Sequence, residues 1–196
     1  KKIIFCCAMM APLFLTAFSV VGQEQAETPI YKDGDSWQFR VVEKGMEVQT
    51  TAVLDRNYQV SFSGGEVTVR PAFRELRRML GIEEERRYLQ FPLVVGKTWH
   101  TRYRLEGPDY MRSTTSVTGV EEVTTSAGTF RALKIERNDT RFGGQGDRGR
   151  GESRVSGKWI YTYYYSPQTR SVVKYSLYIR GGGTREIELI KFRTAR

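Results

Sequence analysis

The sequence is poor in the residues that carry most metal and nucleophilic chemistry. Its 196 residues include only two cysteines and one histidine. A structural zinc site draws its ligands mainly from cysteine and histidine, so this composition excludes the common zinc modules. The sequence also has no Gly-x-Ser-x-Gly elbow, phosphate-binding loop or dinucleotide fingerprint, which excludes the hydrolases and nucleotide-binding proteins that carry those motifs. We therefore expect no metal and no cofactor.

Both cysteines lie in an N-terminal stretch that has the order of a secretory signal. Residues 1–26 begin with two lysines, continue with an apolar run over 3–21 that Pro12 interrupts, and close on a short polar exit. The alternative is a membrane anchor, because the run approaches the roughly 20 residues that span a bilayer. The polar exit favours a signal cleaved after Gly22 or Ala26. We expect an exported protein, periplasmic or secreted, without a transmembrane segment in the mature chain.

The remaining residues, 27–196, contain no cysteine and cannot form a disulfide. About 170 residues are enough to build one domain around its own hydrophobic core, so we expect a single β domain. The formal net charge of the whole sequence is +9. A basic exported chain can meet an envelope macromolecule, an anionic lipid or an acidic glycan, whereas export argues against nucleic acid. The alternative is that lysine and arginine only keep sheet edges soluble.

Most of the chain after Trp37 alternates apolar and polar residues with the period of two that is typical of β-strands. The clearest runs cover residues 37–41, 48–54, 58–62, 97–105 and 185–193. Short strands at a spacing of about ten residues predict a mainly β fold, an antiparallel meander that forms a β-sandwich or an open or incomplete barrel. Valines at 117, 120 and 123 change parity, which indicates a β-bulge, and the last run indicates a bulge or burial on both faces.

Two segments depart from this pattern. Phe73, Leu76 and Leu80 recur at helical spacing, which predicts at most one short helix, near residues 72–80. Residues 141–158 hold six glycines and five basic residues with hardly any apolar content, and predict a flexible loop instead of a strand.

A hairpin rich in tyrosine is the clearest local signal. Trp159 and the alternate residues after it share one face, and Pro167 favours a turn because it fixes φ and has no N–H to donate. With residues 166–170 as the loop, Tyr161 is expected opposite Tyr175 and Trp159 opposite Leu177.

The aromatic row of this hairpin has two interpretations. Trp159, Tyr161, Tyr163 and Tyr175 can line a groove for a lipid or sugar, with the phenolic oxygens as polar handles. Alternatively, the same side chains pack as core beneath another layer.

Three segments resemble a group of uncharacterised exported bacterial β proteins. They are FPLVVGKTW (residues 91–99), GVEEVTTSAGTFRALKIE (119–136) and WIYTYYYSPQTRSVVKY (159–175), against the group's fPLkvGktW, VpAGtF and YSP…VK motifs. Ser126 stands where proline is usual, and Thr169-Arg170 stand where a glycine is common. The resemblance implies an antiparallel β architecture of unknown function, and it supplies no catalytic residues.

The polar residues give little reason to expect catalysis. His100 lies on the wet face of its expected strand beside Arg102 and Arg104, which repel a metal cation. Glu121 with Glu122, or Glu186 with Glu188, are the carboxylate pairs that could serve glycan hydrolysis. The adjacent Glu121 and Glu122 point to opposite faces of a strand, and Glu186 with Glu188 are expected to form a solvated row. We expect a non-catalytic binding or accessory module. A carrier that holds a hydrophobic or glycan ligand in a sheet cavity is the alternative.

Overall fold

The computed structural model describes residues 24–32, 34–43, 46–54, 60–63, 88–105, 107, 109–143, 155–180 and 183–194. Its strands are β1 (Gln25–Ala26), β2 (Ser36–Glu43), β3 (Met46–Leu54), β4 (Val60–Ser63), β5 (Leu93–Val94), β6 (Thr98–Arg104), β7 (Tyr110–Thr125), β8 (Gly128–Phe142), β9 (Val155–Ser166), β10 (Ser171–Ile179) and β11 (Gly183–Arg193). Within these ranges there is no helix that could cross a membrane by its length and apolar character. The expected helix near 72–80 and most of the expected signal over 1–26 lie outside the described residues.

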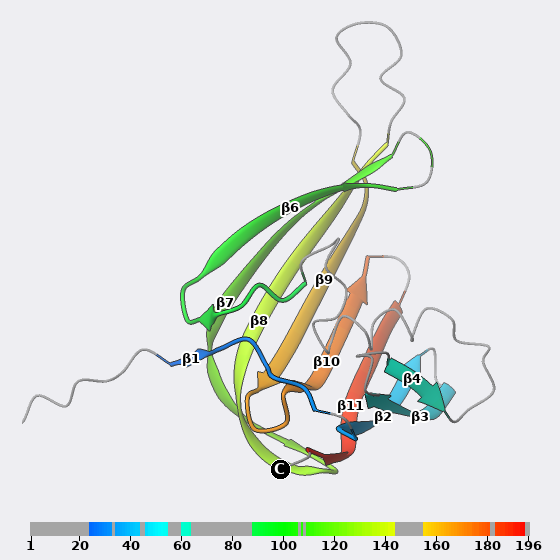
Figure 1. Cartoon of the computed structure of the whole chain (residues 1–196). Coiled ribbons are helices and arrows are strands. Elements are labelled where there is room, and N and C mark those ends of the chain that lie inside the picture. Colours follow the sequence, from blue (N-terminus) through cyan, green and yellow to red (C-terminus); the bar gives the residue numbers. More distant parts are fainter. Residues whose placement is uncertain are drawn as a thin grey trace, which may run out of the picture.

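Nine strands form one antiparallel sheet in the order β4-β3-β2-β11-β10-β9-β8-β7-β6, and β1 pairs with β5 in a separate two-stranded sheet. Neighbours in the large sheet follow one another along the chain, except where β2 pairs with β11. The sheet is strongly curved and stays open between its edge strands β4 and β6 in the described part of the chain (Figure 1). This confirms a mainly antiparallel β fold in its open form.

One face of this sheet, the inner face, holds most of the hydrophobic core. Its buried side chains include Trp37, Phe39, Val41, Ile135, Tyr161, Tyr163, Tyr175, Leu177, Ile187 and Leu189. The opposite, outer face carries mostly polar residues, as β6 illustrates: Trp99 is 7% exposed whereas His100 and Arg102 are exposed. Burial on one face is the arrangement that the alternation predicts for an antiparallel sheet.

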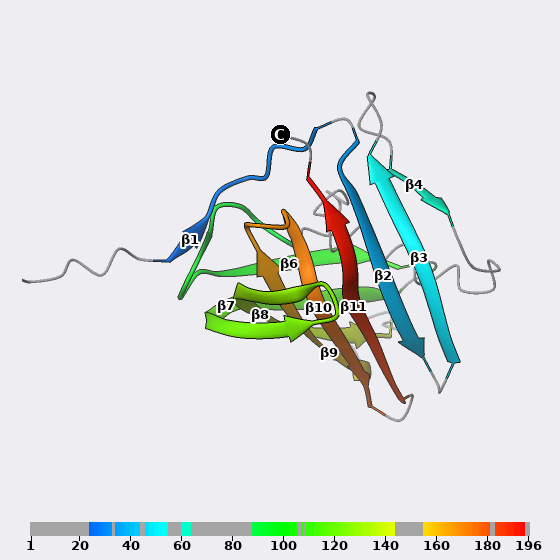
Figure 2. The same ribbon diagram turned by 90° about the horizontal axis from the view of Figure 1, so that it is seen from below.

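Both expected irregularities are β-bulges. The pairing of β7 with β8 shifts between Val117 and Gly119, which explains the change of parity among the valines. The pairing of β11 with β2 shifts between Leu189 and Lys191. Bulges add local twist and curvature to a sheet. Figure 2 shows the end of the β7–β8 hairpin lying across β10 and β11, where the backbone N–H of Ser126 donates to the Glu188 carboxylate at 2.6 Å.

The expected register of the tyrosine hairpin is wrong by two residues. Tyr161 lies opposite Leu177, and Trp159 lies opposite Ile179. One residue of the difference comes from the turn, which is shorter than expected, and the other from a bulge between Val172 and Lys174. Because a shift of two residues keeps the parity of a strand, the aromatic residues still face inward.

The turn of this hairpin explains how the chain accommodates Arg170 in a segment where glycine is common in the group that the motifs resemble. Arg170 adopts a φ of 55°, in the left-handed region that favours glycine. Its guanidinium donates to the buried Asp35 carboxylate at 2.9 Å, and its carbonyl accepts from Tyr31 at 3.1 Å. The indole N–H of Trp37 donates to the neighbouring Thr169 carbonyl at 2.7 Å. These bonds between the turn and the β2 region offset the backbone strain at Arg170.

The loop expected over residues 141–158 is too long at both ends. β8 continues to Phe142 and β9 begins at Val155, and these two residues pair across the strands. Gly157 is a residue that usually indicates a loop, yet it lies within the first part of β9. It has a packing role there, since a Cβ at this position would lie 2.6 Å from the Trp159 ring. Residues 144–154 lie outside the described part, so the expectation of flexibility there stays a prediction.

The first described residues pack onto the domain. Ala26 is 2% exposed and lies opposite Leu93 in the β1–β5 pair. The Glu24 carboxylate forms an ion pair with Arg131 of β8. A chain that began after Ala26 would therefore lack these contacts.

Candidate functional site

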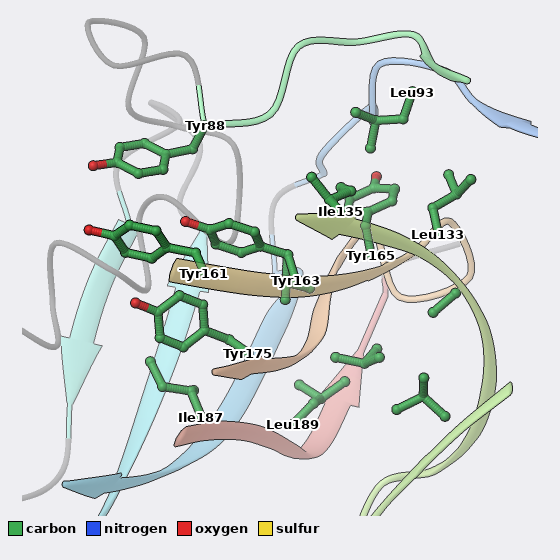
Figure 3. Packing of buried hydrophobic residues seen from close by; sticks show 14 of the residues in the cluster. Tyr88, Leu93, Leu133, Ile135, Tyr161, Tyr163, Tyr165, Tyr175, Ile187 and Leu189 are labelled. Carbon is green, nitrogen blue, oxygen red and sulfur yellow. The ribbon is translucent and has the colours of Figure 1, made fainter. Parts of the chain in front are cut away.

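Three of the four residues expected to line a groove lie in the core. Tyr161, Tyr163 and Tyr175 are 6%, 1% and 1% exposed. The rings of Tyr161 and Tyr163 are nearly parallel with centroids 6.1 Å apart, and those of Tyr163 and Tyr175 are 5.2 Å apart. Tyr88 joins them, with its ring 6.4 Å from that of Tyr161. Figure 3 shows the four hydroxyl groups pointing the same way.

The fourth residue, Trp159, stands apart from this cluster. It is half-buried, pairs with Ile179 and Asp139, and lies over Gly157. Two clefts of about 310 Å³ have other linings. The first is lined by Glu24, Gln25, Val120, Arg131, Leu133, Ser166, Pro167 and Gln168, and the second by Ser36, Trp37, Gln38, Lys191, Phe192 and Arg193. A ligand groove among the aromatic residues stays a prediction.

A buried ion pair lies beside the tyrosine cluster. Arg137 and Asp139 follow Ile135 on the inner face of β8, and both side chains have no exposed surface. Arg137 Nε donates to Asp139 Oδ1 at 2.7 Å, and Nη2 donates to the Ser113 hydroxyl at 2.7 Å. Sequence reasoning missed this pair, although a period of two counted from Ile135 places both residues inward.

The surroundings of Arg137 keep it charged. Its guanidinium carbon lies 4.0 Å from the centroid of the Tyr88 ring, which provides a cation–π contact. Burial alone would lower the pKa of Arg137, but the adjacent Asp139 charge outweighs it and the pKa is raised. The Tyr103 hydroxyl donates to Asp139 Oδ2 at 3.3 Å. Because both ions are sealed from solvent, the pair can stabilise or specify the fold but cannot reach an external partner.

The outer face carries a second cluster of arginine and aromatic residues, which is exposed. It lies at the end of the sheet where β6 ends, β7 begins and β8 ends. We call Arg102, Arg104, Tyr110, Arg112 and Phe142 the arginine platform. Arg102 lies opposite Arg112, and Tyr110 lies between Arg104 and Phe142 in the ladder. The Tyr110 and Phe142 rings stack with centroids 5.0 Å apart and planes 9° apart. The Arg102 guanidinium carbon is 4.3 Å from the Tyr110 centroid, and that of Arg112 is 5.1 Å from the Phe142 centroid.

This arrangement does not favour the stability of the sheet. Like charges directly opposite one another on antiparallel strands, as in Arg102 and Arg112, are destabilising. Contacts with the Tyr110 and Phe142 rings offset part of that repulsion. The placement of Arg102 opposite Arg112 is therefore better explained by binding than by stabilisation of the sheet.

Basic and acidic residues occupy different rows of the outer face around the arginine platform. Lys158 lies opposite Thr140, in the same row as Arg102 and Arg112. From the row of His100 to the platform, no outward-facing strand residue that the structure describes is acidic. The next row holds Glu136 and Glu186.

Carboxylates nearer the other end of the sheet have cationic partners. Glu121 pairs with Lys134 at 3.0 Å, and Glu188 pairs with Arg40 at 2.6 Å. Among the described strand residues of this face, positive charge without an acidic neighbour is therefore found around the arginine platform. The sequence signal for it is the alternation of Arg102 and Arg104 in β6, which by itself predicts only a solvated strand face.

The remaining candidate residues do not form one site. His100 lies on the outer face with Nδ1 3.1 Å from the Thr114 hydroxyl oxygen. Glu122 is exposed next to Glu121 on β7. Glu186 and Glu188 share the outer face of β11, where Arg40 and Ser126 hold Glu188. The absence of enzyme activity stays a prediction.

Comparisons with known proteins give structural likenesses only. No family model and no curated protein matches the chain. Similar solved structures include a "putative lipoprotein" of Parabacteroides distasonis, with TM-score 0.46, 11% identity and coverage of 87% of this chain and 100% of that one. A "putative exported protein with YmcC-like fold" of Bacteroides fragilis has TM-score 0.43, 12% identity and coverage of 86% and 100%.

A third similar structure is the "hypothetical lipoprotein YmcC" of Escherichia coli, with TM-score 0.40, 12% identity and coverage of 81% of this chain and 84% of that one. The descriptions of all three name lipoproteins or exported proteins, the class that the sequence motifs resemble. At these TM-scores and identities, the likeness carries no argument about the partners or activity of this chain.

Proposed function

We propose that this chain is a non-catalytic exported protein that binds an anionic macromolecular partner through the arginine platform. The observation that carries the proposal is the opposition of Arg102 and Arg112, near Arg104 and Lys158, in a part of the outer face where no described strand residue is acidic. A concentrated field of one sign attracts a partner of the opposite sign and accelerates its association. Repulsion at this place weakens the sheet, so binding explains it better than stability does.

Binding to isolated bacterial cell envelopes tests this function. We expect the double charge reversal R102E/R112E to reduce binding at least tenfold, on the order of one kcal/mol for each cation near an anionic surface. The matched control is K174E/K191E, which changes the net charge equally at exposed positions away from the platform. Equal binding by the two double variants would show that the platform has no special role.

The proposal of export depends on the N-terminal sequence, and the structure bears on where a signal would be cleaved. Cleavage after Gly22 would keep Glu24 and Ala26, which contact Arg131 and Leu93, whereas cleavage after Ala26 would remove them. We expect mature protein isolated from an envelope or culture medium to begin at Gln23 by N-terminal sequencing. A mature chain that begins at Lys1, or before it, would contradict the export proposal.

The carrier function has a distinct signature. It requires space for a ligand near Tyr161, Tyr163 and Tyr175, whose rings contact one another. A lipid or glycan retained through purification and detected by native mass spectrometry would support the carrier in place of the platform.

A further inference from the structure

We infer that the arginine platform docks on a membrane surface that contains anionic phospholipids. This inference rests on the proposed function and names the partner. Guanidinium groups donate to phosphate in a planar, two-pronged geometry, and Arg102, Arg104 and Arg112 present three of them on one face. Ring contacts to Tyr110 and Phe142 hold the Arg102 and Arg112 groups in place before binding.

Exposed apolar side chains share the outer face with these cations. Val155, Ile160 and Tyr178 are 48%, 47% and 51% exposed, which makes them three of the four large exposed hydrophobic residues in the described part of the chain. Val155 lies opposite Phe142, and Ile160 lies opposite Tyr178. Cations that reach phosphate groups and apolar groups that enter the boundary between headgroups and acyl chains are the two components of interfacial lipid binding.

The geometry of the rings distinguishes a lipid surface from an acidic glycan. Sugars bind aromatic platforms by stacking on open ring faces. Because β7 lies between β6 and β8, Arg102 covers the Tyr110 face toward β6 and Phe142 covers the face toward β8. A soluble acidic polymer would use the cations but leave Ile160 and Tyr178 in water.

In the described part of the chain, the platform lies at an end of the sheet that projects from the rest of the domain. The far ends of β6, β7, β8 and β9 project beyond β10 and β11 (Figure 1). Lys158, near the start of β9, extends the cationic surface across that end.

Sedimentation with lipid vesicles tests the inference, using the purified protein and three double variants. The vesicles contain phosphatidylcholine alone or with about 30% phosphatidylglycerol, at about 50 and about 500 mM salt. We expect binding to the anionic vesicles to be at least tenfold tighter than to the neutral ones, and to weaken at high salt. R102E/R112E should abolish it, whereas K174E/K191E should retain it within about threefold.

The apolar component has its own variant, I160S/Y178S. It should weaken binding to anionic vesicles about tenfold and leave binding to soluble polyglutamate unchanged. Thermal melts confirm that each variant folds. Equal vesicle binding by I160S/Y178S, or polyglutamate binding as tight as vesicle binding, would favour an acidic polymer and overturn the lipid inference. If envelope binding depends on the platform but the protein does not bind vesicles, the lipid inference is wrong and the proposed function stands. If R102E/R112E binds envelopes as the parent protein does, the lipid inference and the proposed function are both wrong.

Discussion

In the described part of the molecule, arginine contacts tyrosine on both faces of the large sheet, with opposite burial. On the inner face, Arg137 lies 4.0 Å from the Tyr88 centroid and is sealed from solvent together with Asp139. On the outer face, Arg102 lies 4.3 Å from the Tyr110 centroid and is exposed. The contact chemistry is the same in both. What differs is the neutralising carboxylate: Asp139 supplies one at the buried site, whereas none of the described outward-facing strand residues around the exposed site is acidic.

This difference separates a charge that is neutralised inside the fold from a charge that can bind an external anion. A buried cation must be neutralised within the fold, because desolvation of an isolated charge costs several kcal/mol. An exposed cation is solvated and needs no internal partner. A stable fold therefore does not require a carboxylate beside the arginine platform, where no described outward-facing strand residue supplies one, and the positive charge is left for an external anion.

The largest effect should come from breaking the buried pair. Asp139→Ala leaves the Arg137 guanidinium buried without its carboxylate and should destabilise the fold by about 3–5 kcal/mol. Arg102→Ala, the exposed counterpart, should change stability by no more than about 0.5 kcal/mol. Urea denaturation at neutral pH measures both. The double variant Arg137→Met with Asp139→Leu should be less destabilised than Asp139→Ala, since it removes both charges. A cost below about 1 kcal/mol for Asp139→Ala would mean that water reaches this site.

A second pair of variants tests the aromatic residues on the two faces. Tyr161→Ala removes a buried ring and should cost roughly 3–5 kcal/mol, as large-to-small changes in a core do. Tyr178→Ala removes a ring that is 51% exposed and should cost about 0.5 kcal/mol or less. Denaturant titration compares them. If Tyr161→Ala costs below about 1 kcal/mol, the inner face is solvated, and a ligand groove there gains support.

Strand content and facing could be predicted from the sequence, because the period of two is a local property. It placed Tyr161 inward even though its expected partner was wrong, since register depends on turn length and on bulges that the pattern does not fix. The same period also places Arg137 and Asp139 inward, but a local alternation does not show that two charged side chains will be buried as a pair. The arginine platform was beyond prediction for another reason. Its residues come from three strands, and only the pairings of β6 with β7 and of β7 with β8 bring them together.

The smallest expected effect concerns an ion pair that is neither sealed nor fully exposed. Glu188 on the outer face accepts from Arg40 at 2.6 Å, and from the backbone N–H and hydroxyl of Ser126 at 2.6 and 2.9 Å. Burial on its own would raise the pKa of Glu188, but these bonds outweigh it and hold the pKa below its ordinary value of 4.5. Because the folded pKa is the lower one, the stabilisation is complete above about pH 4.5 and is lost as the pH falls through the folded pKa.

Glu188→Gln should therefore cost about 1 kcal/mol near pH 6 and close to nothing at a pH well below the folded pKa, a smaller cost than at Asp139 because solvent screens the pair. Urea denaturation of the variant and the parent protein at both pH values measures the difference. Glu186→Gln is the control, since Glu186 is exposed on the same face of β11, and it should have little effect at either pH. A cost for Glu188→Gln that is the same at both pH values would show that the side chain acts through packing. The contribution of Glu188 to stability, expected to lie between that of the buried Asp139 and those of the exposed platform residues, would then come from its packing and not from its charge.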